Sequence, residues 1–158
     1  MKRQLAQRAG TVAAGFAAAV GVLAPGAAAD AVYHTQHMRL APVGGAPLRS
    51  GFVQNIKANG PVVYAHEIYV LNGAAPRTTY TVTNHFFVGD AHCADPLKES
   101  PFDTATFTTN RSGNGRADLM LAPADIGGLT GVHSARWTIR NAADQVVYRT
   151  GCSTVTLD

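Results

Sequence analysis

The chain has 158 residues and a formal net charge of +3, with 13 basic and 10 acidic side chains. Three of the basic residues, Lys2, Arg3 and Arg8, stand near its start, so the remainder carries ten basic and ten acidic residues. Those ten basic residues are scattered singly between Arg39 and Arg149. Nucleic acids and anionic membranes are bound by clustered basic side chains. The charge pattern therefore excludes both as expected partners.

Residues 1–29 have the three-part pattern of a secretory signal peptide. A basic start is followed by an uncharged stretch rich in Ala, Val and Gly from residue 11 to residue 24, and then by small residues at 27–29. The apolar stretch is shorter than the roughly 20 residues that a membrane-spanning helix needs, and we predict no transmembrane segment. We expect cleavage near Ala29-Asp30, with a second small-x-small site after Ala31. The prediction is a secreted protein with one domain over residues 30–158.

The first half of this domain is predicted to form four strands, at residues 31–40, 51–59, 61–71 and 77–89. The last of these alternates clearly between two faces of a strand. One face carries large apolar side chains, and the other carries polar ones. The apolar face is expected to hold Tyr80, Val82, Phe86 and Val88, and the polar face Thr79, Thr81, Thr83 and His85.

The second half is also predicted to consist of strands and turns. "NRSGNG" (110–115) separates two strand-like segments, and its Asn and Gly residues predict a hairpin between them. In the segment 132–141, Ala135, Trp137 and Ile139 are expected to face the core. A final long strand follows residue 145, with a β-bulge expected at Gly151.

About eight short strands separated by turn signals favour an all-β fold. Our first choice is an antiparallel immunoglobulin-like β-sandwich, and our second is a closed small β-barrel. The Ala-rich leader, the low charge and the strand pattern resemble small exported β-sandwich proteins of high-GC Gram-positive (actinobacterial) bacteria. That resemblance contains no motif from which functional residues could be transferred.

The two cysteines, Cys93 and Cys152, are predicted to form a disulfide, because exported domains most often pair their cysteines. The sequence "GDAHCADP" (89–96) also raises the alternative of a reactive His92–Cys93 pair. Neighbouring residues on an extended chain point to opposite faces, whereas a nucleophile and its base must converge. We therefore favour the disulfide and predict no catalytic residues.

Six histidines in a small domain raise the question of a zinc or copper site. No HxH or HExxH pair is present, so ligands would have to converge from different strands. The candidate ligands are His34, His37, His85 and His92. The carboxylates around residues 90–103 lack the spacing of a calcium loop, and no cofactor is expected.

The sequence leaves three functions open. The first is a secreted non-catalytic module that binds an extracellular protein or a cell-wall ligand, or belongs to the cell envelope. The second is an extracellular metal-binding or small hydrolytic domain that uses clustered histidines. The third is a protease inhibitor that presents the loop 94–101, held at one end by Cys93, because a tethered loop loses less entropy on binding. The candidate binding residues in this loop are Asp95, Leu97, Lys98 and Glu99. The pattern indicates no particular oligomeric state.

Overall fold

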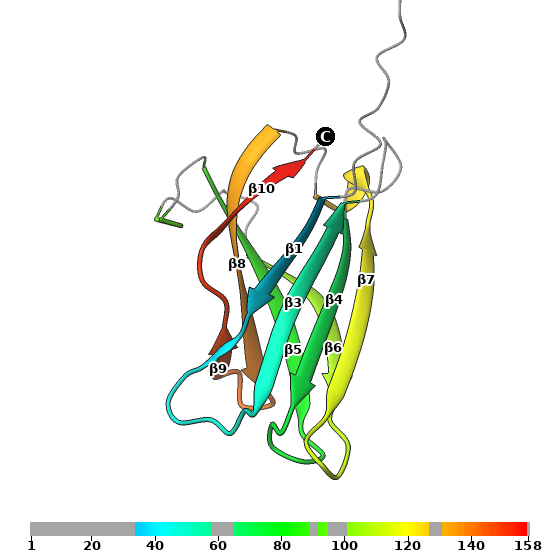
Figure 1. Ribbon diagram of the computed structural model, residues 1–158, viewed down its shortest axis with the longest axis vertical. Helices are drawn as coiled ribbons and strands as arrows, with labels where there is room; N and C mark the ends of the chain where they lie inside the picture. Colours follow the sequence, from blue (N-terminus) through cyan, green and yellow to red (C-terminus); the bar gives the residue numbers. More distant parts are fainter. Residues whose placement is uncertain (1–33, 58–64, 89–91, 95–100, 127–130, 158) are drawn as a thin grey trace, which may run out of the picture.

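The computed structural model describes residues 34–57, 65–88, 92–94, 101–126 and 131–157. This part of the chain folds into two antiparallel sheets that pack face to face (Figure 1). The elements in chain order are β1 (His34–Arg39), β2 (Ala41–Pro42), β3 (Ser50–Lys57), β4 (Ala65–Asn72), β5 (Thr79–Val88), β6 (Phe102–Thr108), β7 (Gly115–Leu121), a 3-10 turn (Pro123–Ile126), β8 (Gly131–Asn141), β9 (Val146–Arg149) and β10 (Ser153–Leu157). Within the described ranges, no helix is long and apolar enough to cross a membrane.

Sheet A has four strands in the order β1-β3-β4-β7, and sheet B has the order β2-β9-β8-β5-β6 with β10 also paired to β8. The chain passes from one sheet to the other at Leu40, whose side chain is buried between them. The predicted antiparallel β-sandwich with one disulfide is confirmed. Two antiparallel sheets packed face to face are the architecture of immunoglobulin-like domains, which many domains share without the same topology.

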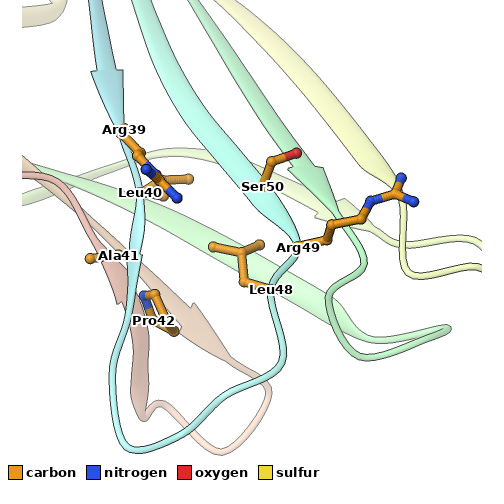
Figure 2. A pocket seen from close by; sticks show the side chains of 7 residues that line it. All are labelled: Arg39, Leu40, Ala41, Pro42, Leu48, Arg49 and Ser50. Atoms are coloured by element: carbon orange, nitrogen blue, oxygen red, sulfur yellow. The ribbon is translucent and has the colours of Figure 1, made fainter.

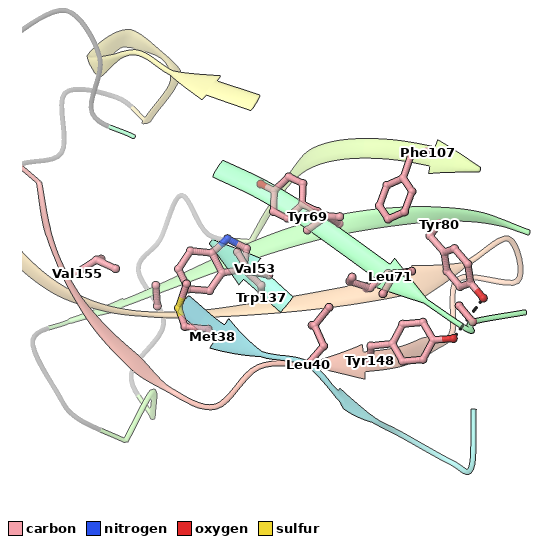
Figure 3. Close-up of a cluster of buried hydrophobic side chains, with 14 of the residues drawn as sticks. Met38, Leu40, Val53, Tyr69, Leu71, Tyr80, Phe107, Trp137, Tyr148 and Val155 are labelled. Carbon is pink, nitrogen blue, oxygen red and sulfur yellow. Dashed lines mark hydrogen bonds between the residues drawn. The ribbon is translucent and has the colours of Figure 1, made fainter. Parts of the chain in front are cut away.

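The core lies between the two sheets and consists of large apolar side chains from both (Figure 3). Trp137, Tyr69 and Tyr148 are its largest fully buried members. Ala135, Trp137 and Ile139 are all fully buried on β8, as the alternation predicts. Residue periodicity is therefore a sound guide to the interior of sheet B.

On β5, the predicted apolar face is likewise buried at Tyr80, Val82 and Phe86. The side chain of Val88 lies outside the described residues. Thr83, on the predicted polar face, is nevertheless only 5% exposed. Neighbouring polar side chains on the outer face of sheet B cover it, as described below.

The predicted hairpin around residues 110–115 is wrong. β6 pairs with β5 in sheet B, whereas β7 pairs with β4 in sheet A, so this turn carries the chain from one sheet to the other. The turn closes on itself through the Asn110 N–H, which donates to the Asn114 carbonyl at 2.8 Å. It also packs on the turn after β4, where the Ala74 N–H donates to the Gly113 carbonyl at 3.0 Å. The same Asn and Gly residues suit a hairpin and a crossover, and only the pairing of distant strands distinguishes the two.

The predicted last strand is interrupted rather than bulged. β9 and β10 both pair with β8, and residues 150–152 separate them. Cys152 in this gap bonds to Cys93, with 5.8 Å between their Cα atoms and a sequence separation of 59. The disulfide confirms the predicted pairing, and it links the chain that follows β5 to the break beside β8.

Candidate binding face on sheet B

A shallow groove of about 490 Å³ lies on the outer face of sheet B. Its lining comes from the strands β5, β6, β8 and β9 and from the residue before β6. The lining residues are Thr83, His85, Pro101, Asp103, Thr138, Arg140 and Val146. Most of them are polar, and they stand on paired strands, which hold them more rigidly than loops would.

A β-bulge on β6 determines which side chains reach this groove. Val82 pairs with Ala105 and Thr83 pairs with Asp103, so Thr104 is the extra residue. Regular alternation from Ala105 would turn Asp103 towards the core. The extra residue reverses this, so Asp103 reaches the outer face while the Thr104 hydroxyl lies in the interior.

A second bulge lies at the same level on β9. Ile139 pairs with Tyr148 and Arg140 pairs with Val146, which leaves Val147 as the extra residue. Val147 packs against the core, and Val146 is 40% exposed at the edge of the groove. Bulges occur often beside functional sites, where they redirect side chains.

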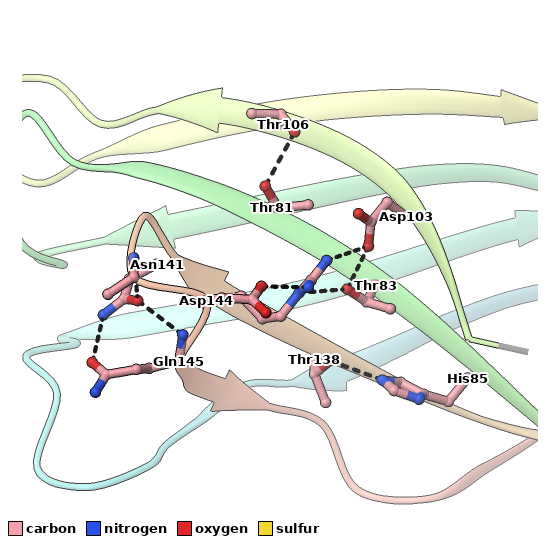
Figure 4. A network of polar contacts seen from close by, with 11 residues as sticks. Thr81, Thr83, His85, Asp103, Thr106, Thr138, Asn141, Asp144 and Gln145 are labelled. Atoms are coloured by element: carbon pink, nitrogen blue, oxygen red, sulfur yellow. Dashed lines mark hydrogen bonds and ion pairs between the residues drawn. The ribbon is translucent and has the colours of Figure 1, made fainter.

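The side chains of Thr83, Asp103 and Asp144 belong to one polar network on this face (Figure 4), and all three contact the guanidinium of Arg140. This guanidinium donates to Asp103 Oδ1 and Asp144 Oδ1, each at 2.5 Å, and to Thr83 Oγ1 at 3.1 Å. The Thr83 hydroxyl in turn donates to Asp103 Oδ1 at 2.8 Å. The Arg140 side chain is 24% exposed, whereas that of Asp103 is 56% exposed. The network thus fixes the orientation of a carboxylate that solvent and ligands can reach.

His85 lies beside this network, and its Nε2 is 2.9 Å from Thr138 Oγ1 (Figure 4). Partial burial lowers the pKa of His85, and the positive charges of Arg136 and Arg140 act in the same direction, against the opposite effect of Asp103. The lowered pKa favours a neutral imidazole at pH 7, where it can both donate and accept a hydrogen bond.

The polar face extends beyond the groove along β5 and β6. Thr79 and Thr108 hydroxyls are 2.9 Å apart, and those of Thr81 and Thr106 are 3.3 Å apart. Cross-strand pairs of this kind stabilise a sheet and orient the hydroxyls. The outer face of sheet B is therefore polar along most of the length of these two strands.

A smaller hollow of about 230 Å³ lies where the chain crosses from sheet A to sheet B (Figure 2). Leu40, Pro42 and Leu48 form much of its lining. Figure 2 shows the guanidinium of Arg49 directed away from Leu48 and Pro42. This hollow lacks the ordered polar network of the groove on sheet B, which is the stronger candidate site.

The structure does not bring the candidate metal ligands His37 and His85 together. His37 comes one residue before the inward-facing Met38 on β1, so it lies on the outer face of sheet A, where its ring is 4.4 Å from that of Phe52. His85 points outward from sheet B, on the opposite side of the sandwich. The side chain of His34 lies outside the described residues, and His92 is exposed beside Cys93. Among the described residues, no three His, Cys, Asp or Glu side chains form a group that could hold a metal ion.

The candidate loop residues Asp95, Leu97, Lys98 and Glu99 lie outside the described residues, so the inhibitor hypothesis stays a prediction. The same is true of the signal peptide at residues 1–29.

Sequence reasoning missed a buried carboxyl group. Glu67 on β4 is 1% exposed and faces the core. The Trp137 Nε1–H donates to Glu67 Oε2 at 2.9 Å, the Tyr69 hydroxyl donates to the same oxygen, and the Asn84 amide donates to Oε1 at 3.4 Å. Burial raises the pKa of Glu67 to about 7, although the hydrogen bonds from Tyr69 and Trp137 act in the opposite direction. Solvent does not reach the Glu67 carboxyl group, so it affects the stability of the fold and cannot contact a ligand at the surface.

The signal for this group was present in the alternation of "AHEIYVL" (65–71), which places Glu67 and Tyr69 on one face and Ile68 and Val70 on the other. An alternation with a period of two residues shows which side chains share a face of the strand, but it does not show which of the two faces is buried.

Comparison with protein-family models, curated proteins and solved structures finds no match to this chain.

Proposed function

We propose that the protein is a secreted, non-catalytic β-sandwich module that binds a polyhydroxylated ligand, such as a cell-envelope glycan, through the outer face of sheet B. The observation that carries this proposal is the ordered network of Arg140, Asp103 and Thr83 in the groove. Binding sites work best when their polar groups are already oriented, because little entropy is then lost on binding.

The chemistry of the groove favours hydroxyl groups over ions. The Arg140 charge lies between two carboxylates, so the described residues that line the groove leave no uncompensated cation for a strong anion. The exposed Asp103 carboxylate accepts hydrogen bonds, and a neutral His85 beside Thr138 can donate and accept them. Sugars present adjacent hydroxyls that need both donors and acceptors.

The openness of the groove supports a binding role rather than catalysis. Asp103 is 56% exposed, and its neighbours hold it on the surface of a sheet. Catalytic sites instead exclude water, because electrostatic interactions then become stronger.

The test is binding of the secreted protein to insoluble cell-wall polysaccharide, followed by calorimetry with soluble fragments of it. We expect the Asp103→Asn variant to bind at least roughly tenfold more weakly, because charge-assisted hydrogen bonds contribute about 1.5–3 kcal/mol. Asp118→Asn is a matched control, because Asp118 is 53% exposed on the outer face of sheet A and is also paired to an arginine, Arg116.

The measurements are made at low protein concentration, with the thermal stability of each variant checked first. Equal binding by the wild type and by Asp103→Asn would refute the assignment to this face. Binding of a folded wild type to none of the polysaccharides would refute the proposed ligand class.

A further inference from the structure

The end of the sandwich at which β4 and β6 finish carries three exposed arginines, each on a different turn. Arg49 lies just before β3, Arg77 lies between β4 and β5, and Arg111 lies between β6 and β7. The antiparallel pairing of β3 with β4, of β4 with β7 and of β5 with β6 places the three turns together at this end, the lower one in Figure 1.

Backbone hydrogen bonds connect these turns, which keeps the three arginines on one part of the surface. The Arg49 N–H donates to the Asn72 carbonyl, at the start of the turn after β4, at 2.9 Å. The Arg77 N–H, at the far side of the same turn, donates to the Asn110 carbonyl at 3.2 Å, and Arg111 follows Asn110 in the chain. We call Arg49, Arg77 and Arg111 the arginine cluster.

The positive charges of the arginine cluster are not neutralised by acidic side chains. Among the described residues, the arginines that form ion pairs are Arg116 and Arg140, and no member of the cluster takes part in one. The three turns, residues 43–49, 73–78 and 109–114, contain no Asp or Glu. Basic residues that stand singly in the sequence are thus brought together by the fold. Their summed positive potential attracts an anionic ligand.

We propose that the arginine cluster binds an anionic polysaccharide, a glycan that carries acidic groups along its chain. The planar guanidinium of arginine can donate two parallel hydrogen bonds to an acidic group of this kind. Exposed ion pairs contribute only about 0.2–1 kcal/mol each. A polymer that meets all three arginines at once therefore fits the cluster better than a single small ion does.

The composition of the three turns favours a polysaccharide over a nucleic acid. Single-stranded nucleic acids are bound largely through stacking of their bases on aromatic side chains. Residues 43–49, 73–78 and 109–114 contain no Phe, Tyr or Trp. Ser112, which is exposed beside Arg111, instead offers a hydroxyl that can donate to and accept from a sugar hydroxyl.

This surface is separate from the groove on sheet B. The groove takes its charge from Arg140, which two carboxylates already compensate. The two surfaces therefore differ in the ligand groups that they favour: hydroxyl groups at the groove and acidic groups at the arginine cluster. Variants at one surface should leave binding at the other unchanged.

The test compares binding of the secreted protein to dextran sulfate and to neutral dextran of the same length. The two polymers share one sugar backbone, so the difference in affinity reports the acidic groups alone. We expect at least tenfold tighter binding to dextran sulfate at about 50 mM salt. Three arginine contacts give a slope of roughly −2 for log affinity against log salt, so the affinity should fall about tenfold or more between 50 and 200 mM.

The triple variant Arg49→Gln/Arg77→Asn/Arg111→Gln should bind dextran sulfate no more tightly than dextran. Asparagine is chosen at position 77 because Arg77 has a φ of +50°, which asparagine adopts more readily than glutamine does. We also expect Arg111→Gln alone to weaken binding to dextran sulfate at least threefold. Arg149→Gln is its matched control, because Arg149 is exposed on β9 and the variant changes the net charge equally; thermal melts establish that each variant is folded.

Equal binding of the wild type to the two dextrans would overturn the proposal. A preference for dextran sulfate that the triple variant keeps, or that Arg149→Gln weakens as much as Arg111→Gln does, would overturn it too. Tighter binding to a single-stranded oligonucleotide of equal charge than to dextran sulfate would refute the polysaccharide as the ligand class. Asp103→Asn should leave the preference for dextran sulfate unchanged, which keeps the outcome independent of the groove.

Discussion

The buried carboxyl group of Glu67 makes the stability of this sandwich depend on pH. Its pKa rises from 4.5 in the unfolded chain to about 7 in the folded protein, because burial disfavours the charged form. The folded state therefore binds this proton more tightly than the unfolded state does. The contribution of Glu67 to the free energy of unfolding is greatest below pH 4.5 and is lost as the pH rises to about 7.

The size of this effect follows from the shift in pKa. Each unit corresponds to about 1.4 kcal/mol, so the shift costs the protein about 3 kcal/mol at pH 8 relative to low pH. A domain of ordinary stability has about 5–15 kcal/mol in all, so this loss is measurable.

The Glu67→Gln variant should remove this dependence, because glutamine has the shape of the protonated acid and does not titrate. Its carbonyl can accept the hydrogen bonds from Tyr69 and Trp137. Its amide can donate to Asn84 Oδ1, which is buried and has no hydrogen-bond partner in the structure, after rotation of the Asn84 amide. We expect Glu67→Gln to exceed the wild type by about 3 kcal/mol at pH 8 and to match it within about 1 kcal/mol at pH 5.

Urea unfolding of both proteins at pH 5, 6, 7 and 8 measures this difference directly. His85 contributes with the opposite sign, because its lowered pKa costs stability as the pH falls. The difference between the two proteins at each pH cancels that contribution. A difference that is the same at pH 5 and at pH 8 would refute the reasoning.

Two further predictions concern the covalent and backbone features of the fold. The double variant Cys93→Ala/Cys152→Ala should lose roughly 4 kcal/mol of unfolding free energy, since the disulfide closes a loop with a sequence separation of 59. Denaturant titrations measure this loss. A loss below about 1 kcal/mol would show that other contacts already restrain the loop. Gly113→Ala should cost about 3 kcal/mol or more, because Gly113 has a φ of +73° and its new Cβ would meet the Ala74 carbonyl oxygen at 2.0 Å. Gly151→Ala is the control, with no atom within 4 Å of the added Cβ, and thermal melts should show little change; equal effects at the two glycines would contradict this account.

Local periodicity was sufficient to predict much of sheet B. The alternation in β5 and β8 identified Tyr80, Val82, Trp137 and Ile139 as interior residues, and all four are buried. The leader predicts an exported protein, and export in turn predicted the disulfide between the two cysteines, which the structure contains. Each of these features depends on neighbours in the sequence or on composition, which a single chain displays directly.

Sequence alone did not predict the groove or the interior of sheet A. The register of β6 against β5 turns Asp103 outward and Thr104 inward, and a bulge in that register arises only when the two strands pair. The inward position of Glu67 has the same origin, because both faces of β4 are apolar enough to be buried.

The sequence by itself thus determined where most of the strands run, which side chains share a face wherever the alternation is regular, and that Cys93 and Cys152 pair. The tertiary structure decided which face of each strand is inside, which strands are neighbours, and which polar groups meet. The physical reason is that a period of two is a local property of the backbone. Burial and register, in contrast, depend on contacts between residues far apart in the chain, such as those of Glu67 with Trp137 and of Arg140 with Asp103.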